Sequence, residues 1–342
     1  MTMIGMLHYR VHPSKLKKAY ACAAIAKLEG YDFFYFSPGK VNLENETILA
    51  WVYDSGEWKQ KEMPFPDVIY NAGGPKTAMQ KNVYRTLKEK IPFTSFSVGT
   101  KMNVYKKIQE GKEFADYIIP FNKIKNFSTI IHFLNKYNKV VIKPFSGSKG
   151  KNVFFLEKRE HLYCLFNGET EQLVTLKSLK NFYKTKLKSK KYLIQKFITC
   201  QTITGTSYDF RMHVQKDGDG KWIINRIYPR LAGGVKPINN ISGGGFRGVL
   251  DAFLVDEFKE EHFNMKRYLE QFALMFSNHF DSLYNKSFDE LGIDIAIDKQ
   301  RKIWLYEVNW RPGSKTRELD FARYLIPYAV YLAENAKIGS RA

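Results

Sequence analysis

Acidic and amide side chains near the C-terminal end of the chain stand at a spacing that could gather them on one face of a β-hairpin. Glu307 and Asn309 stand two residues apart in one apolar run, and Asp294 lies within the apolar run before it. Side chains alternate faces along a strand, so Glu307 and Asn309 project the same way, and Asp294 could reach that side from the partner strand. Two carboxylates and an amide oxygen suit magnesium, which keeps waters and phosphate oxygens as its other ligands. The alternative is a polar sheet face exposed to solvent.

A lysine at the end of a β-branched run, followed by a loop of small residues, gives a second candidate site. Lys143 follows the run 140–142, and the loop extends from Ser146 to Lys151. A sheet would hold the lysine stem so that its ammonium points at an anion, and small residues let backbone N–H groups approach a phosphate closely. The loop is not a Walker P-loop, because both the glycine spacing and the Ser or Thr after the lysine differ. The sequence predicts a phosphate-binding loop, although a flexible basic hairpin would have a similar pattern.

Two other patterns are weaker. The glycines at 243, 245 and 248 match G-x-G-x-x-G, but the residues before them do not form a strand. A dinucleotide fingerprint needs that strand, so we interpret the pattern as a loop whose Arg247 is available to an anionic ligand. The seven histidines are scattered, and their spacing indicates no nucleophilic triad.

The elements that must position these residues alternate between strands and helices. Residues 1 to about 97 predict a small α/β unit that contains a hairpin around the turn 54–56 and a helix over 77–90. Later residues predict helices over 101–109 and 124–135, a strand over 139–143, hairpins pairing 210–215 with 222–228 and 292–297 with 303–308, and a helix over 319–336.

The composition indicates a globular, basic protein. Of the 342 residues, 44% are hydrophobic, and 54 basic residues against 34 acidic ones give a net charge of +20. That charge attracts anions without choosing among nucleic acid, an acidic membrane surface, nucleotide phosphates and an acidic peptide. No nucleic-acid module can be recognised, so nucleic acid is not the expected partner. The basic segment Lys177 to Lys191 is expected to be a solvated face, with the steering of an acidic peptide as the alternative.

The sequence also bears on location. The three cysteines are widely separated without Cys-x-x-Cys spacing, which favours reduced thiols over a disulfide framework or a zinc site. The apolar run at the N-terminus is short and has no small-residue cleavage site, which argues against a signal peptide. No stretch approaches the ~20 apolar residues of a membrane-spanning helix. We therefore expect a soluble, cytoplasmic protein that has no membrane partner.

Several motifs, taken together and in order, resemble the ATP-grasp superfamily. They are Ile142-Lys143-Pro144 with its loop, Tyr208-Asp209-Phe210-Arg211, Gly292-Ile293-Asp294, and Glu307-Val308-Asn309 followed by Arg311-Pro312-Gly313. Within that superfamily the chain looks like the YheC/YheD group associated with bacterial endospore coats. This closer likeness is carried by Pro66-Asp67-Val68-Ile69-Tyr70, Asp209-Phe210-Arg211 and Ile241-Ser242-Gly243-Gly244. The resemblance covers nearly the whole chain.

The resemblance implies an α/β ATP-grasp fold with an N-terminal Rossmann-like pre-ATP-grasp domain. The domains would be an N-terminal α/β domain over 1–97, a small central lobe with the phosphate loop over 98–192, and a C-terminal lobe with the magnesium site over 193–342. ATP would be gripped between two antiparallel sheets.

The resemblance also implies roles for particular residues. The lysines that bind the nucleotide phosphates would be Lys101 and Lys143, and the flexible loop over the phosphates would contain Ser146, Gly147, Ser148 and Gly150. The hinge that meets the adenine edge would consist of Gln195, Lys196, Phe197 and Ile198, and Asp209 would bind the ribose hydroxyls. The catalytic arginines would be Arg211, Arg230 and Arg311, and the first two could neutralise the transferred phosphoryl group. The magnesium ligands would be Asp294, Glu307 and Asn309. Many relatives have a glutamate where Gln195 stands, which bears on how the adenine amino group is recognised.

The activity implied by the resemblance is ATP- and magnesium-dependent joining of a carboxylate to an amine through an acyl phosphate. The carboxylate substrate and amine acceptor could include an amino acid or an acidic peptide in spore-coat maturation. One alternative is a catalytically inactive ATP-binding or structural spore-coat protein, and the other is a polyanion or nucleic-acid binder. The sequence specifies neither the substrates nor the oligomeric state.

Overall fold

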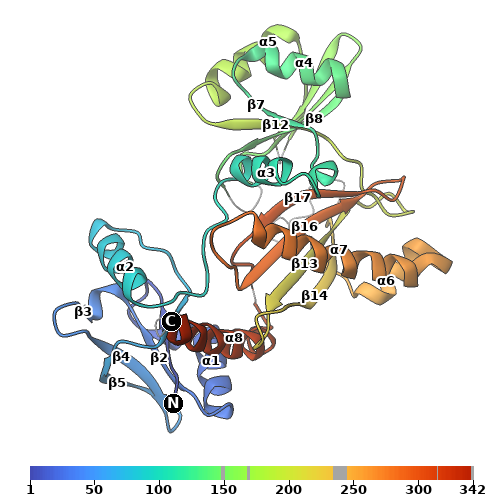
Figure 1. The fold of residues 1–342 in the computed structure, drawn as a ribbon. Coiled ribbons are helices and arrows are strands. Elements are labelled where there is room, and N and C mark those ends of the chain that lie inside the picture. The colour runs from blue at the N-terminus through green and yellow to red at the C-terminus, as the bar shows by residue number, and fades with distance from the viewer. Residues whose placement is uncertain (148–150, 168–169, 234–244, 314, 340–342) are drawn as a thin grey trace.

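The computed structural model describes residues 1–147, 151–167, 170–233, 245–313 and 315–339. Within these residues, three β-sheets, each with its own helices, form an N-terminal unit, a central lobe and a C-terminal lobe (Figure 1). This mixture of helix and sheet agrees with the predicted α/β class. Among the described helices, none is both long enough and apolar enough to cross a lipid bilayer.

The N-terminal sheet has the strand order β3-β4-β2-β1-β6, with β5 paired to β4. Its strands are β1 (Met3–Leu7), β2 (Asp32–Phe36), β3 (Val41–Asn42), β4 (Thr47–Asp54), β5 (Glu57–Pro64) and β6 (Val68–Asn71). Strand β1 runs parallel to both β2 and β6, whereas β4 is antiparallel to β2 and β5. The parallel core is compatible with a Rossmann-like unit, and the pairing of β4 with β5 confirms the predicted hairpin around 54–56.

Three helices accompany this sheet, and one of them comes from the far end of the chain. They are α1 (Lys17–Leu28), α2 (Ala78–Lys90) and α8 (Glu318–Gly339). The face of α1 that packs inward is rich in buried alanines, which let another helix approach closely. Helix α8 uses that room and buries Phe321, Leu325 and Ile326 in the same core as β1, β2 and β6 (Figure 1). The helix predicted over 319–336 is thus confirmed, but it packs on the N-terminal sheet.

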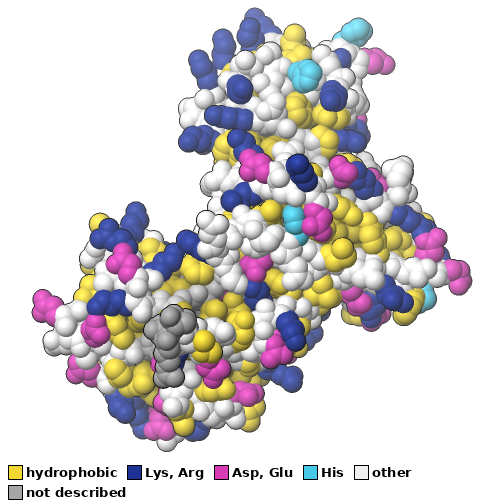
Figure 2. Space-filling view, in the orientation of Figure 1, with side chains coloured by type: hydrophobic (Ala, Val, Ile, Leu, Met, Phe, Trp, Pro, Cys, Tyr) yellow, Lys and Arg dark blue, Asp and Glu magenta, His cyan; other side chains and the backbone are white. Residues whose placement is uncertain are grey.

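The central lobe is an antiparallel sheet in the order β11-β10-β9-β8-β12-β7. Its elements are β7 (Phe121–Lys123), α4 (Phe127–Tyr137), β8 (Lys139–Pro144), β9 (Phe154–Arg159), β10 (Leu162–Phe166), β11 (Glu171–Val174), α5 (Leu176–Phe182), a π-helical turn (Tyr183–Leu187) and β12 (Tyr192–Lys196). The seven lysines between Lys177 and Lys191 are all exposed. Figure 2 shows basic side chains gathered over this lobe, which confirms the predicted solvated face.

The C-terminal lobe is a second antiparallel sheet, in the order β15-β14-β13-β16-β17. Its strands are β13 (Tyr208–Lys216), β14 (Trp222–Leu231), β15 (Phe246–Arg247), β16 (Glu290–Ile297) and β17 (Ile303–Asn309). Its helices are α6 (Leu250–Phe258) and α7 (His262–Ser282). Both predicted hairpins are confirmed, because β13 pairs with β14 and β16 with β17. The glycine pattern that begins at Gly243 lies partly outside the described residues.

Helix α3 (Lys101–Glu110) connects the lobes. Although it precedes the central lobe in sequence, its residues Val104, Tyr105 and Ile108 are buried in the core of the C-terminal lobe. The start of the helix is therefore held beside β17 while the chain continues into the central sheet. The domain boundaries given above stay predictions, and β12 begins at the proposed boundary between 192 and 193.

Candidate active site

Strand register brings three candidate residues into one row across the C-terminal sheet. Asp294 of β16 stands opposite Glu307 of β17, and Arg211 of β13 stands opposite Asp294 on its other side. Residues directly opposite each other in an antiparallel pair share a face. The alternation of strand side chains thus gives the juxtaposition of Asp294 and Glu307 that the sequence predicts, and Asn309 follows two residues later on β17.

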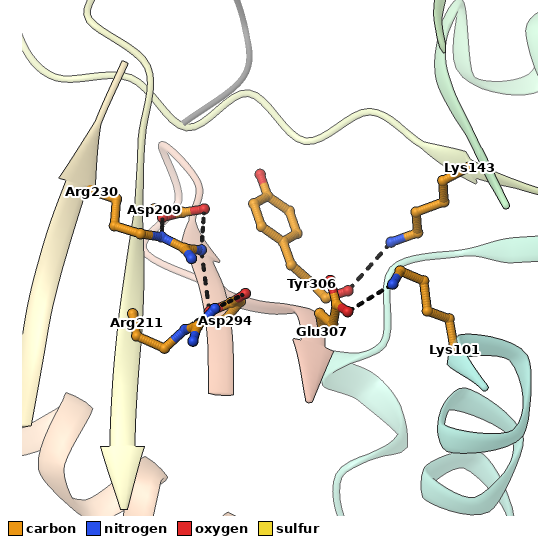
Figure 3. A network of polar contacts seen from close by, with 8 residues as sticks. All are labelled: Lys101, Lys143, Asp209, Arg211, Arg230, Asp294, Tyr306 and Glu307. Carbon is orange, nitrogen blue, oxygen red and sulfur yellow. Dashed lines mark hydrogen bonds and ion pairs between the residues drawn. The ribbon is translucent and has the colours of Figure 1, made fainter. Parts of the chain in front are cut away.

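On one side of this row, two aspartates and two arginines alternate in a chain of ion pairs (Figure 3). We call it the closed network, because each of its four charged groups is bonded to an opposite charge within the chain. Arg230 donates from Nε to Asp209 Oδ1 (2.6 Å) and from Nη2 to Asp209 Oδ2 (2.7 Å). The same Nη2 lies 3.2 Å from Asp294 Oδ1. Arg211 holds Asp294 through Nε and through Nη2, which lies 2.9 Å from Oδ2. Every charge in the network thus meets an opposite charge.

Burial makes this network costly to disturb. Asp209 and Asp294 are 6% exposed, and the side chains of both arginines are nearly buried. Burial alone would raise the pKa of Asp294, but Arg211 and Arg230 bring that pKa below its ordinary value. Asp294 is therefore ionised, and its oxygens already accept bonds from two guanidinium groups.

On the other side of the row, two lysines face β17 from different elements. Lys101 begins α3, whose first turn is capped by the Thr100 side chain, and its Nζ lies 2.7 Å from Glu307 Oε1. Lys143 belongs to β8, and its Nζ donates to Tyr105 Oη (2.8 Å) and to the Tyr306 carbonyl oxygen (3.3 Å). The Tyr105 hydroxyl in turn donates to that same carbonyl.

Lys143 lacks a carboxylate partner among the described residues, although its side chain is largely enclosed. Burial lowers the pKa of its ammonium to about 8, and the more distant Glu307 and Asp294 only partly oppose this effect. The sequence identified Lys143 but missed Tyr105 and the Tyr306 carbonyl. Tyr105 sits in a helix with ordinary amphipathic spacing, so its sequence carries no signal that separates it from a core residue.

A cavity of about 200 Å³ opens between these groups. It is lined by three segments, 98–101, 145–147 and 307–310, together with Val104 and Tyr105. The predicted residues Lys101, Ser146, Gly147, Glu307 and Asn309 thus line one space between the central and C-terminal sheets. Ser148 and Gly150 lie outside the described residues.

The donors around the cavity fit a magnesium ion that is shared with a phosphate. Within the described residues, no group of three or more His, Cys, Asp or Glu side chains could hold a metal alone. Glu307 and Asn309 offer hard oxygens to the cavity, and magnesium commonly takes its other ligands from waters and phosphates. In this structure Glu307 is paired with Lys101, and Asp294 is held by Arg211 and Arg230.

The remaining predicted residues lie around this centre. Gln195 and Lys196 end β12, where Gln195 is buried. The backbone N–H of Phe197 donates to the backbone carbonyl oxygen of Lys139. The Ile198 carbonyl accepts a long bond (3.5 Å) from the Tyr306 hydroxyl, which ties this segment to β17.

The third predicted catalytic arginine occupies a different setting. The Arg311 guanidinium lies 3.8 Å from the centre of the Trp310 ring, and the Trp310 side chain lines the cavity. The structure thus places Arg311 one residue beyond the cavity lining, apart from the network of Arg211 and Arg230. The roles assigned to these three arginines and to Asp209 stay predictions.

Comparison with known proteins agrees with this arrangement. The family described as YheC/D like ATP-grasp matches residues 90–332. Among curated proteins of Bacillus subtilis (strain 168), the endospore coat-associated protein YheC is 26% identical over 302 residues, covering 84% of this chain and 82% of that protein. The endospore coat-associated protein YheD is 24% identical over 325 residues, covering 87% and 71%.

Solved structures show the same fold at low sequence identity. D-alanyl-alanine synthetase A from Vibrio cholerae gives a TM-score of 0.58 at 13% identity, covering 97% of this chain and 98% of that one. A Chryseobacterium gregarium RiPP-associated ATP-grasp ligase, solved with ADP and a leader and core peptide, gives 0.52 at 13% identity, covering 98% and 97%. With more than half of its length matched by the family, the chain belongs to the YheC/D like ATP-grasp family.

Proposed function

We propose that this protein is an ATP- and magnesium-dependent ligase that activates a carboxylate and joins it to an amine. The observation that carries the proposal is the single cavity in which Lys101 meets Glu307 and Asn309, with Lys143 beside it on β8. Positive side chains on one wall and hard oxygen donors on the other suit a metal-bound triphosphate. Membership of the ATP-grasp family supports the same nucleotide.

Each predicted residue has a place in this proposal. Lys101 and Lys143 bind phosphate oxygens, the loop that starts at Ser146 closes over them, and the segment 195–198 receives the adenine edge. Glu307 and Asn309, with Asp294 behind them, would hold magnesium, which when bound neutralises the phosphate oxygens. When the nucleotide binds, the Lys101 ammonium would leave Glu307 and bind a phosphate oxygen instead. We also propose Asp209 as the ribose carboxylate and the three arginines at 211, 230 and 311 as the catalytic arginines.

The chemistry follows from charge. A carboxylate oxygen attacks the γ-phosphorus of ATP, the bond to ADP breaks, and an acyl phosphate forms. The nitrogen of an amine then attacks the acyl carbon, phosphate leaves, and the nitrogen loses a proton. Two anions must approach each other in the first step, so the lysines and arginines have to cancel repulsion and stabilise the equatorial oxygens. Positioning of the three reactants contributes the rest.

A substrate screen tests the proposal. We expect ADP release that requires both a carboxylate and an amine, with an amide in the products by mass spectrometry. Glu307→Gln should lower that turnover by about 100-fold, comparable with the loss of one transition-state donor. Glu334→Gln is the charge-matched control, because Glu334 is exposed on α8, which packs on the N-terminal sheet, and is not part of the cavity lining. Full turnover by Glu307→Gln would contradict the proposal.

We further propose that the carboxylate belongs to an amino acid or an acidic peptide and that the product serves the endospore coat. The names of the two curated relatives support the coat role, and the net charge of +20 supports an acidic substrate. Those names also favour a second candidate, a coat protein that binds ATP without turnover. Magnesium-dependent ATP binding with no product in the same screen would distinguish it.

A further inference from the structure

The strand order of the N-terminal sheet reverses at β1. The chain goes from β1 to β2 on one side, and later returns to β6 on the other, with all three strands parallel. In open α/β sheets, ligands bind in the crevice outside the carboxyl ends of the strands at such a reversal. In this sheet the corresponding position is beyond Leu7 and Asn71, where the segments 8–12 and 72–77 follow the two strands.

Basic side chains from three segments meet at this end of the sheet. Lys76, in the loop after β6, places its Nζ 3.6 Å from the ring centre of Tyr9, which stacks on His8 at 4.2 Å. Arg311 arrives from the end of β17, where its Nη2 lies against Gly74, 3.7 Å from the position a Cβ would take there. Arg10 follows in the first loop and is exposed.

The loop after β6 can approach this closely because it contains glycines. A Cβ on Gly73 would lie 2.9 Å from His8 Cδ2 and 3.1 Å from the Tyr9 ring. Real Cβ atoms do not come so close to a packed ring, so any larger residue at Gly73 would push the two loops apart. The sequence thus holds Lys76 and Arg311 next to His8.

The positive charges at this end of the sheet have no ion-pair partners. Within the described residues, none of Arg10, Lys76 and Arg311 forms a salt bridge. The carboxyl groups that interact electrostatically with Arg311 are those of Asp289 and Glu290. Burial raises the pKa values of both to about 7. These acids are buried and part of the core, so they do not supply the missing counter-ions at the surface.

His8 adds a neutral donor to the same place. Its Nδ1 lies 3.1 Å from the backbone nitrogen of Arg10 and 3.1 Å from the Tyr35 hydroxyl, which itself donates to the Arg10 carbonyl oxygen. In the tautomer in which Nδ1 accepts the bond from Arg10, the ring proton is on Nε2. Burial, together with the charges of Arg10, Arg311 and Lys76, lowers the pKa of His8 to about 4. A neutral ring in this tautomer can donate from Nε2 to an anion without adding positive charge to the three cations.

We propose that His8, Arg10, Lys76 and Arg311 form the binding site for a carboxylate of an acidic substrate. This proposal rests on the proposed function, because Trp310 connects the two sites. Trp310 lines the cavity, and the Arg311 guanidinium lies over its ring. A carboxylate held here would lie next to the phosphate-binding cavity. The planar fork of Arg311 matches the two oxygens of a carboxylate, which a single ammonium does not.

The experiment uses the full-length chain and a hexaglutamate peptide labelled with fluorescein at its N-terminus, titrated by fluorescence anisotropy with MgADP present. We expect Arg311→Gln to bind the peptide about tenfold more weakly than the wild type, because a charge-assisted bidentate contact is lost. The double variant Arg10→Gln/Lys76→Gln, confined to exposed loops, should lose about fivefold. Lys27→Gln is the control, since Lys27 is exposed in the last turn of α1, just before the amino end of β2 and thus away from the carboxyl ends of the parallel strands.

Three results would overturn the proposal. One is equal affinity of the wild type and both sets of variants, and another is the absence of wild-type binding at about 1 mM peptide. The third is binding of inorganic phosphate at this site without binding of the peptide. A parallel titration with MgADP separates the two claims: if the wild type binds the peptide but not MgADP, the ligase proposal fails while the carboxylate site stands.

Discussion

Two groups of charges border the same row of the C-terminal sheet, yet they are built in opposite ways. The aspartates and arginines on β13, β14 and β16 are mutually bonded, and each guanidinium meets a carboxylate at hydrogen-bond distance. The lysines at 101 and 143 have one carboxylate, Glu307, between them. The first group is closed and buried, and the second borders a cavity of about 200 Å³.

The difference separates charges that form ion pairs with one another in this structure from charges that have donors available to a ligand. In this structure the closed network leaves few lone pairs or protons for an added ion, so the proposed contacts of Asp209 and Asp294 with a ligand would require some of its bonds to rearrange. The lysine side has donors in excess, so a phosphate can enter without displacing a guanidinium. The comparison predicts that damage to the first group is felt mainly as lost stability, and damage to the second mainly as lost nucleotide affinity.

The largest effect is expected for Arg230→Met, which tests the closed network. Asp209 would remain buried without its bidentate partner, and the removal of one member of a buried ion pair costs about 3–5 kcal/mol. The free energy of unfolding, measured with urea, should fall by that amount. Arg226→Met on the same strand is the control, because Arg226 contacts the Tyr228 ring and has no carboxylate bonded to it in the described residues.

This first prediction can fail in an informative way. If Arg230→Met unfolds at the same urea concentration as the wild type but binds MgADP more weakly, Arg230 belongs with the ligand-binding charges. The predicted role of Arg230 at the transferred phosphoryl group would then gain support, and the contrast between the two groups would be lost.

The same contrast explains how far the sequence could reach. Alternation within a hairpin is a local rule, so the pairing of Asp294 with Glu307 was predictable from their own strands. The bond from Arg230 to Asp209 was not, because it depends on the register of a hairpin that contains a bulge after His213. Tyr105 was also beyond reach, since it meets Lys143 only after α3 has packed on β17.

Longer-range placement was equally hidden in the sequence. The pattern of the last helix predicted its length, but its burial against α1 depends on alanines some 300 residues earlier. The gathering of Arg311 with His8 and Lys76 likewise requires the packing of the C-terminal lobe on the N-terminal sheet. Contacts between distant segments carry no periodic signal, so a single sequence does not reveal them.

A smaller effect is expected for Lys143→Met, which tests the open group. The change keeps the stem and removes the ammonium, so MgADP affinity should fall by about 1.5–3 kcal/mol, the contribution of a hydrogen bond to a charged group. The free energy of unfolding should stay the same or rise, because a buried ammonium is costly. Calorimetric titration and urea unfolding measure the two quantities.

Lys139→Met is the matched control at the other end of β8. Lys139 is half exposed and bonded to Glu157 at 2.9 Å, and it begins the strand, whereas Lys143 lies near the end that leads to the cavity lining. It should leave both quantities unchanged within about 0.5 kcal/mol. Equal losses of affinity in the two variants would show that general positive charge, rather than the placement of Lys143, attracts the nucleotide.

The smallest effect, and the sharpest test of the contrast, is expected for Tyr105→Phe. The Tyr105 hydroxyl accepts a bond from the Lys143 ammonium and so stabilises its charged form. Without it, the pKa of Lys143 should fall below about 8. A lysine is charged below its pKa and loses that charge as the pH rises through it, so the variant should lose MgADP affinity at a lower pH than the wild type. At neutral pH the loss should be about 1 kcal/mol.

Titrations of MgADP from about pH 6 to pH 9 would measure this shift, and the ionisation of ADP cancels because it is common to both proteins. Tyr163→Phe is the control, since Tyr163 lies half-buried on β10 near the outer edge of the central sheet. Superimposable pH curves for Tyr105→Phe and the wild type would mean that Lys143 does not carry the pH dependence. A downward shift of the curve with an unchanged free energy of unfolding would instead show that Tyr105 tunes the lysine for its ligand, because a bond that served only the fold would alter stability and leave the pH profile in place.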